Sequence, residues 1–400
     1  MASAPVIYLD SQDYSRFGDV LRGKSDSKTE ALFLALEQRK QSGDAIFAVS
    51  MPLLGELLQY HEDYRETTIR KAEAVERLCG GWALAFPSRL IAAEVASAAR
   101  RFELLPQQNE TTVLTSDWYW YPNVADSFRN LRAQIQEGLD KEMATRALPT
   151  RTMRRQAKKA LQKIDFAAVA RESASQMAEK LGLPIDAITG SIVSLLRGKV
   201  TPEEASRKLF GAIAEPVKFV EMYFEVIEGD RSLLPAWMKD FGIRFETLFR
   251  ELRDNVQSLL KVDIGRNSFD AALAERTLSF GEAILKLAEG DTAELGIDKE
   301  LFARLRRNSQ ITSQIPACDI VGNVLTCYIR QILGFAGTEA KIEDSFGGDL
   351  VHALYLPHVD LWRGDRRFSE VIKNAVPSYA NKVVSKLNSL AAAIDAHLTA

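Results

Sequence analysis

The sequence predicts an α/β/α protein whose parallel sheet is built from both ends of the chain and interrupted by a large all-helical insertion. Over the first hundred residues, short β-favouring apolar runs alternate with amphipathic helical segments, which is typical of a parallel sheet with helices on its faces. Helical periodicity dominates from about residue 105 to 310, and the alternation then returns. The simplest organisation is one α/β domain formed by residues 1–104 and 311–400, with residues 105–310 inserted as a helical domain.

The N-terminal segment begins with a predicted buried strand. Residues 5–9, PVIYL, are apolar and β-favouring, and an aspartate follows them. Residues 29–40 have amphipathic spacing and stop at a Ser-Gly pair, which predicts a helix. Residues 45–50, AIFAVS, predict a second strand.

A further helix and a further strand–helix unit follow. Pro52 lies where a helix would begin after the second strand, a position that tolerates proline because a first-turn N–H has no partner within the helix. That helix carries Glu56 among leucines. Residues 82–87, WALAFP, predict a third strand, and residues 88–102 predict the helix after it.

The remaining elements are mostly helical. Breaks at glycine- and proline-containing turns divide the middle into candidate helices over residues 124–145, 150–181, 184–197, 202–228, 241–261, 267–288 and 298–307. Near the C-terminus, helices are predicted over residues 315–333, 347–356 and 366–375, with a strand at 358–362.

Composition excludes several classes of protein. With 46% hydrophobic and 26% charged residues, the chain is typical of globular proteins, and a net charge of -3 argues against a uniformly basic nucleic-acid coat. Its three cysteines have no CxxC spacing, which argues against a disulfide framework or a zinc knuckle. The first residues have no basic region and only a short apolar run, so we expect no signal peptide, and no apolar stretch approaches the roughly 18–20 residues that a membrane helix needs. We therefore expect a cytoplasmic protein without membrane contact.

Four acidic residues lie where a parallel sheet would bring them together. Asp10 ends the first strand, Glu56 lies on the helix after the second, Asp349 is placed at a helix start, and Asp365 follows the late strand. Strand ends and helix starts share one edge of such a sheet. Clustered carboxylates repel one another unless a hard cation is bound, and oxygen ligands suit Mg²⁺ or Mn²⁺. Such a metal activates water and neutralises charge on a phosphoryl group.

Each acid also has a structural interpretation. Asp349 could serve only as a helix N-cap, and Glu56 could be a partly exposed helix residue. Taken together, the four acids favour a site. Asp344 is a reserve candidate because loop acids near such sites often support the ligands, and Glu94 is a weaker reserve.

Two neighbours of these acids are interpreted differently. Asp360 begins the late strand and is interpreted as a turn or salt-bridge residue. His352 follows Asp349 by three residues and lies on a similar helix face, so it could approach the site. Helix packing is the preferred interpretation of His352.

The segments that carry the four acids resemble the motifs of PIN-domain nucleases in their order and strand context. The matching segments are VIYLD at Asp10, VSMPLLGELL at Glu56, DLVHALYLPHVD at Asp349 and VDLWRGDRRF at Asp365. The resemblance covers residues 5–100 and 315–376. It departs from the family pattern at Gly364, where Thr or Ser is common before the final aspartate.

This resemblance implies a PIN-like fold and a bacterial endoribonuclease that hydrolyses phosphodiester bonds with Mg²⁺ or Mn²⁺. It implies a catalytic set in which Asp10, Asp349 and Asp365 hold the metal. Glu56 would be a further ligand or the positioner of the attacking water. A toxin or defence role is also implied, with the helical insertion as a sensor or as the contact for a regulatory protein partner.

A basic stripe is the candidate binding surface for RNA. Within residues 151–163, five cations recur at helical spacing on one face, which suits the tracking of phosphates: Arg151, Arg154, Arg155, Lys158 and Lys159. A solvated face, or a contact for an acidic helix, is the alternative. Arg366 and Arg367 lie beside the predicted metal site. The aromatic run at residues 117–123 could stack bases, but core packing is preferred.

Two other classes of function are weighed against the nuclease. A haloacid dehalogenase-like phosphohydrolase needs Asp-x-Asp after its first strand, whereas here Asp10 and Asp13 are one residue too far apart. A non-catalytic protein- or RNA-binding module of PIN-like and helical parts is the second alternative. The sequence has no GxxxxGK[ST] loop and no GxSxG motif, which argues against a P-loop NTPase and a serine hydrolase.

Overall fold

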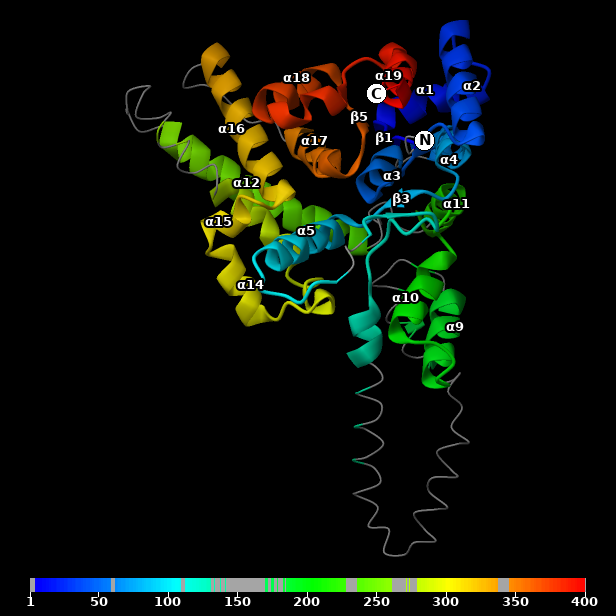
Figure 1. The fold of residues 1–400 in the computed structure, drawn as a ribbon. Helices are drawn as coiled ribbons and strands as arrows, with labels where there is room; N and C mark the ends of the chain where they lie inside the picture. The colour runs from blue at the N-terminus through cyan, green and yellow to red at the C-terminus, as the bar shows by residue number, and fades with distance from the viewer. Residues whose placement is uncertain are drawn as a thin grey trace, which may run out of the picture. The chain divides into compact units, whose positions relative to one another are not determined.

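A computed structural model describes residues 4–58, 62–108, 112–130, 185–227, 236–260, 279–336 and 345–399, with isolated positions between 133 and 183 and at 271 and 273. The chain forms two compact units (Figure 1). The first contains residues 1–121, 215–224 and 238–400, and the second contains residues 122–214 and 225–237. The boundaries predicted from the sequence, at 104 and 310, stay a prediction.

A four-stranded parallel sheet lies in the first unit and joins both ends of the chain. Its strands, in spatial order, are β2 (Ile46–Phe47), β1 (Val6–Tyr8), β5 (Leu361–Arg363) and β6 (Val383–Val384). Ile7 pairs with Phe47 on one side and with Leu361 on the other, so an N-terminal strand is flanked by a C-terminal one. This confirms the predicted α/β class, with a largely helical middle and a sheet made from the two ends.

The helices of the first unit pack around this sheet. Figure 1 shows α16 to α18 on one side of β1 and α1, α2 and α4 on the other. The N-terminal helices are α1 (Ser11–Leu21), α2 (Ser27–Ser42), α3 (Met51–Leu57), α4 (Arg65–Cys79) and α5 (Pro87–Arg101). The C-terminal helices are α14 (Lys299–Arg306), α15 (Ser309–Thr312), α16 (Pro316–Ala336), α17 (Ser345–Ala353), α18 (Arg366–Ala375) and α19 (Leu390–Thr399).

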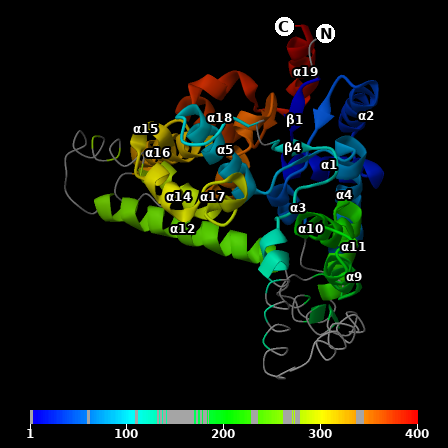
Figure 2. The same cartoon turned by 60° about the horizontal axis from the view of Figure 1, so that its bottom comes forward.

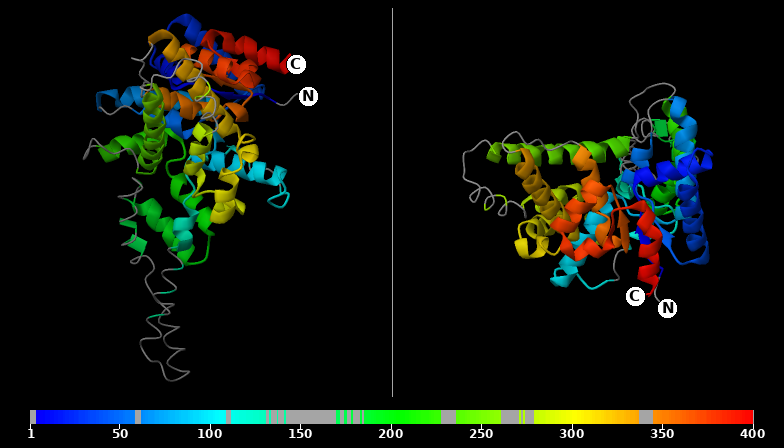
Figure 3. Two further views of the ribbon diagram at one scale, coloured as in Figure 1. Left: turned by 90° about the vertical axis from the view of Figure 1, so that its left-hand side faces the viewer. Right: turned by 90° about the horizontal axis from the view of Figure 1, so that it is seen from above.

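Two long-range contacts fix helices that are distant in sequence. α19 lies beside α2, where Arg39 and Asp395 form an ion pair of 2.6 Å, and Figure 3 shows α19 in red at the C-terminal end of the chain. α12 (Ala236–Leu260) passes close to α17 in Figure 2, and Phe249 of α12 contacts Phe346 of α17 at 6.1 Å between ring centroids.

The remaining elements are short or belong to the middle of the chain. α11 (Pro216–Ile227) lies mainly in the first unit, and the second unit contains α9 (Ile185–Leu196) packed on α10 (Pro202–Gly211). Thr201 and Glu204 form a capping box at the start of α10. The 3-10 helices are η1 (Glu62–Tyr64), η2 (Leu285–Ala288), η3 (Ala293–Leu295), η5 (Leu356–His358), η6 (Pro377–Lys382) and η7 (Leu387–Ser389).

Several expected elements differ from those observed. The predicted third strand is β3 (Ala83–Leu84), but it pairs antiparallel with β4 (Leu114–Thr115) and touches the main sheet through one bridge from Val49 to Ala83. The helix expected over 202–228 is two helices, because Pro216 begins a new one. The helices α1 and α4 and the strands β4 and β6 were not predicted.

Buried aromatic side chains form much of the core of the first unit. Trp120, Trp362 and Tyr8 are among its largest fully buried side chains. In the aromatic run at 117–123, Tyr119 and Tyr121 are also buried, which confirms core packing for these residues. None of the helices in the described part of the chain is both long enough and apolar enough to cross a membrane.

Candidate functional site

The carboxyl edge of the parallel sheet positions the predicted acids. Asp10 follows β1 and Asp365 follows β5, and because these strands pair in parallel both residues leave the sheet at the same edge. Glu56 lies on α3, which follows β2. Asp349 lies on α17, which contacts α3. Four distant stretches of sequence therefore reach one place.

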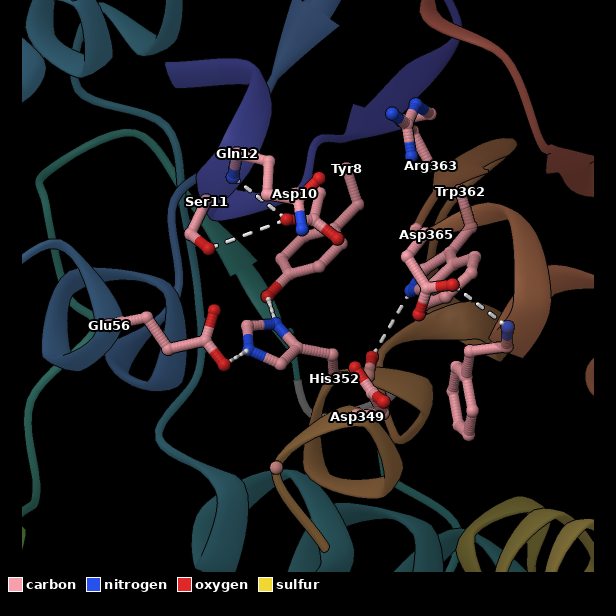
Figure 4. A pocket seen from close by; sticks show the side chains of 13 residues that line it. Tyr8, Asp10, Ser11, Gln12, Glu56, Asp349, His352, Trp362, Arg363 and Asp365 are labelled. Carbon is pink, nitrogen blue, oxygen red and sulfur yellow. Dashed lines mark hydrogen bonds and ion pairs between the residues drawn. The ribbon is translucent and has the colours of Figure 1, made fainter. Parts of the chain in front are cut away.

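All four acids line a single pocket of about 490 Å³. Figure 4 shows Glu56 on one side, Asp365 on the other, and His352 and Asp349 between them. The other lining residues are Tyr8, Ser11, Gln12, Gly348, Trp362, Arg363, Gly364 and Phe368. The structure thus brings together the acids that the sequence singled out, while their chemical roles stay predictions.

Asp10 and Asp365 each cap a helix with one carboxylate oxygen. Oδ1 of Asp10 accepts the Gln12 N–H at 2.8 Å at the start of α1. Oδ1 of Asp365 accepts the N–H groups of Arg367 at 2.6 Å and Phe368 at 3.0 Å at the start of α18. Within the described residues, Oδ2 of neither carboxylate forms a hydrogen bond. Capping fixes both side chains at the pocket and leaves one oxygen of each for another ligand.

Asp349 has no capping role. α17 begins at Ser345, so Asp349 lies in the second turn, and the expectation that it starts a helix was wrong. Its carboxyl group forms no hydrogen bond within the described part of the chain. Burial, together with the nearby negative charge of Asp365 and, more weakly, of Glu56 and Asp10, raises the pKa of Asp349 to about 7. Among the described residues, the carboxyl group of Asp349 therefore has no hydrogen-bond partner and lies near three other acids.

Glu56 contacts His352 across the pocket. Oε1 of Glu56 lies 3.0 Å from Nε2 of His352, and the Glu56 side chain is 41% exposed while that of His352 is 9% exposed. Burial raises the pKa of Glu56, but the His352 charge and contact, with help from Ser11, outweigh it, so the pKa is lowered. Burial lowers the pKa of His352, but the Glu56 carboxylate outweighs it, so the pKa is raised. His352 therefore lines the site rather than only packing α17.

A buried hydrogen-bond chain continues behind His352. The Tyr8 hydroxyl lies 2.6 Å from Nδ1 of His352 and 2.7 Å from Oγ of Ser50, the N-cap residue of α3. Burial, with the nearby Tyr355, raises the pKa of Tyr8 well above its ordinary value, so its hydroxyl keeps its proton. The sequence analysis did not identify Tyr8 and Ser50 as site residues. Tyr8 and His352 are 344 positions apart, so no local pattern marks their contact.

A second buried polar pair lies beside the pocket and was also missed. Nη2 of Arg363 donates to Oδ1 of Asp13 at 3.0 Å, and the two side chains are 6% and 0% exposed. Burial raises the pKa of Asp13 to about 7 although the Arg363 guanidinium opposes the shift. Asp13 does not line the pocket that Asp10 lines. The two aspartates that the phosphohydrolase alternative requires are therefore directed to different places.

Gly364 is required by its neighbour Trp362. A Cβ atom at position 364 would lie 2.2 Å from Cη2 of Trp362, closer than van der Waals contact allows. The indole N–H of Trp362 donates to the carbonyl of His352 at 3.1 Å, which holds the ring over this position. The glycine at which the sequence departs from the PIN pattern thus makes room for the indole.

Other predicted residues lie away from the pocket or outside the described residues. Oδ2 of Asp360 accepts the Val6 N–H at 2.8 Å and ties β5 to β1, a structural role as expected. Glu94 is buried and pairs with His358 at 2.6 Å, so it does not belong to this site. Arg366 and Arg367 are exposed in the first turn of α18, beside Asp365. The reserve acid and the basic stripe fall outside the described residues: Asp344, Arg151, Arg154, Arg155, Lys158 and Lys159.

The donors fit a hard cation in chemistry but not yet in spacing. Asp10, Asp349 and Asp365 offer carboxylate oxygens, the ligands that Mg²⁺ and Mn²⁺ prefer. As the side chains stand, no group of three or more His, Cys, Asp or Glu residues in the described part of the chain could hold a metal ion. Coordination would therefore need rotation of these short side chains toward one another.

Comparison of the chain with protein families, curated proteins and solved structures finds no match in any of the three.

Proposed function

We propose that the protein is a metal-dependent nuclease of PIN-like type, with RNA as the substrate class that the sequence resemblance implies. The observation that carries this proposal is the convergence of four acids in one pocket, with Asp349 unpaired and its pKa raised to about 7. Such a cluster is unfavourable by itself because like charges repel. A bound cation would remove that cost.

Asp10, Asp349 and Asp365 are the residues that would hold Mg²⁺ or Mn²⁺. When bound, the cation would neutralise charge on the phosphoryl oxygens and acidify a water molecule. The helix-capping bonds of Asp10 and Asp365 use Oδ1 and leave Oδ2 for this purpose. Neither carboxylate oxygen of Asp349 forms a hydrogen bond within the described residues, so both are available to a cation that Asp10 and Asp365 would also bind.

We assign Glu56 the role of orienting the attacking water and accepting its proton. Its carboxylate is held ionised beside His352 and lines the pocket opposite Asp365. In the hydrolysis, the water oxygen bonds to phosphorus and its proton passes to Glu56. The bond from phosphorus to the leaving ribose oxygen breaks, and that oxygen takes a proton from solvent.

Arg366 and Arg367 supply a site for the phosphates that flank the cleaved bond. Cations in the first turn of a helix oppose the helix dipole, so helix stability does not explain these two residues. Arg367 also lines a small cavity together with Asp349 and Asp365. An extended polyanion that crosses the acid pocket would pass the Arg367 side chain, and Arg366 is exposed next to it.

The test is a cleavage assay on labelled single-stranded RNA and DNA with Mg²⁺, Mn²⁺ or EDTA. We expect metal-dependent cleavage of RNA that falls on the order of 10²–10³-fold in Asp10→Asn and Asp349→Asn. Asp26→Asn is the matched control, because Asp26 caps α2 in the same manner outside the pocket. A wild-type protein that cuts neither substrate and gains no thermal stability from metal would contradict the proposal. The non-catalytic binding module would then lead.

A further inference from the structure

We propose that His352, backed by Tyr8 and Ser50, is a positioning residue that holds the Glu56 carboxylate in its working orientation. This inference rests on the proposed function and adds a residue outside the four acids. Glu56 needs such support more than the other acids. Asp10 and Asp365 are fixed by backbone N–H groups, whereas Glu56 has a longer side chain that is 41% exposed.

The contacts of His352 suit it for this task. Its imidazole is buried, and both nitrogens have a contact: Nε2 faces Oε1 of Glu56 at 3.0 Å and Nδ1 faces the Tyr8 hydroxyl at 2.6 Å. The Trp362 indole N–H donates to the His352 carbonyl at 3.1 Å and secures the backbone of the same residue. The Nδ1 contact and the fixed backbone orient the ring so that Nε2 is directed at the glutamate.

The hydrogen bonds of this chain can all point in one direction. When the imidazole is neutral, the Ser50 hydroxyl can donate to Tyr8 and the Tyr8 hydroxyl to Nδ1 of His352, and the Nε2 proton then faces Glu56. When the imidazole is protonated, Nε2 presents a proton to Glu56 as well. Tyr8 is fully buried, with its hydroxyl between Ser50 and His352, so it is positioned to donate to Nδ1. The tautomer that presents a proton to Glu56 is thereby selected. This series of hydrogen bonds begins at Ser50, the N-cap residue of α3, which is the same helix that carries Glu56.

The kinetic test compares variants that keep or remove the donor. His352→Phe retains a ring without nitrogens, and we expect kcat to fall about 10²-fold with KM changed less than about threefold, because a small displacement of a reacting group has that effect. His352→Gln retains an N–H donor and should stay within about tenfold of wild type. Tyr8→Phe should lower kcat by about tenfold and have no further effect in His352→Phe, because both act through Glu56.

Three results would overturn the inference. They are full activity of His352→Phe, a loss in proportion to unfolded protein, and effects of His352→Phe and Tyr8→Phe that multiply in the double variant. The stabilisation by Mn²⁺ should persist in His352→Phe, because Asp10, Asp349 and Asp365 remain. If the wild type neither cleaves nor responds to Mn²⁺, the proposed function fails, and the ¹³C NMR titration of the Glu56 carboxyl decides the positioning role. A higher pKa of Glu56 in His352→Phe than in wild type supports it, and equal values overturn it.

Discussion

Two histidine–glutamate pairs of this protein have the same chemistry and different surroundings. In the pocket, His352 and Glu56 lie 3.0 Å apart and the glutamate side chain is 41% exposed. In the core, His358 and Glu94 lie 2.6 Å apart and the glutamate is 3% exposed. The second oxygen of Glu94 accepts the Ala317 N–H at 2.7 Å, so both of its oxygens are satisfied.

The difference separates a structural pair from a pair available for chemistry. Glu94 joins α5, the 3-10 helix η5 and α16, and its carboxylate has no oxygen left for another ligand. Glu56 contacts His352 through one oxygen and lines a pocket with three aspartates. Water and ligands therefore reach one pair and are kept from the other. Burial and the count of satisfied oxygens distinguish the two, whereas the residue types do not.

The largest expected effect is on stability at the core pair. Glu94→Ala removes one partner of a buried pair and should lower the free energy of unfolding by about 3–5 kcal/mol. Glu56→Ala breaks a pair whose carboxylate is 41% exposed and should cost only about 1 kcal/mol. Urea denaturation of both variants measures the difference. Equal losses would contradict the distinction between the pairs.

Activity should show the opposite order. Glu56→Gln removes the charge that we assign to the attacking water and should lower kcat on the order of 10²-fold. Glu94→Gln keeps the size and an acceptor for the Ala317 N–H, so the folded variant should cleave within about threefold of wild type. Rates are measured on one RNA at saturating Mn²⁺ and corrected for the folded fraction. A larger loss in Glu94→Gln would place the working pair in the core.

The Trp362 ring, which contacts the backbone of His352, offers a way to disturb the His352–Glu56 pair without changing the His358–Glu94 pair. Gly364→Thr introduces the residue common in the PIN pattern, and its Cβ would meet the Trp362 ring at 2.2 Å. Displacing the ring breaks its bond to the His352 carbonyl and should cost about 1–3 kcal/mol. Gly348→Ala is the control, because a Cβ there meets only Oε1 of Glu56 at 3.7 Å. Thermal unfolding of both variants checks this; a neutral Gly364→Thr would show that the indole can move freely.

The smallest effect is a pH-dependent gain in stability. The pKa of Asp349 is raised to about 7 from 3.8, so the folded protein binds more protons between these values and this group's contribution to stability falls as the pH rises toward 7. Asp349→Asn removes that loss and should be more stable than wild type at pH 8, on the order of 1 kcal/mol after solvent screening. The advantage should vanish near pH 4. A destabilised variant at pH 8, measured by the same unfolding assay, would mean that the carboxylate is paired.

The fold and the acids could be predicted where local patterns carry the signal. Asp10 and Asp365 directly follow apolar strands, and parallel strands share an edge, so their meeting follows from sequence order. Asp349 reached the pocket as expected but not at a helix start. The predicted helix begins at Gly347, two residues after the observed start of α17 at Ser345. Within α17 a Cβ atom at Gly347 would lie 3.3 Å from the Phe249 ring, so the close packing of α12 favours glycine there despite its low helix propensity.

Contacts between distant residues left no such signal. Asp13 and Arg363 are 350 positions apart, and Tyr8 and His352 are 344 apart, so neither pair forms a local pattern. The strand β6 has only two residues, Val383 and Val384, too few for periodicity to show. His352 was noted for its spacing from Asp349, but its contact with Glu56 depends on how α3 and α17 pack.

The central claim is that three aspartates of the pocket bind one divalent cation, and the most direct measurement is the binding of Mn²⁺ to the full chain. Electron paramagnetic resonance of free Mn²⁺ at pH 7.5 gives the affinity for wild type, Asp349→Asn and Asp26→Asn. The account predicts a Mn²⁺ site in wild type and Asp26→Asn that Asp349→Asn weakens at least about 100-fold. Equal Mn²⁺ binding by all three proteins, or binding by none, would contradict it.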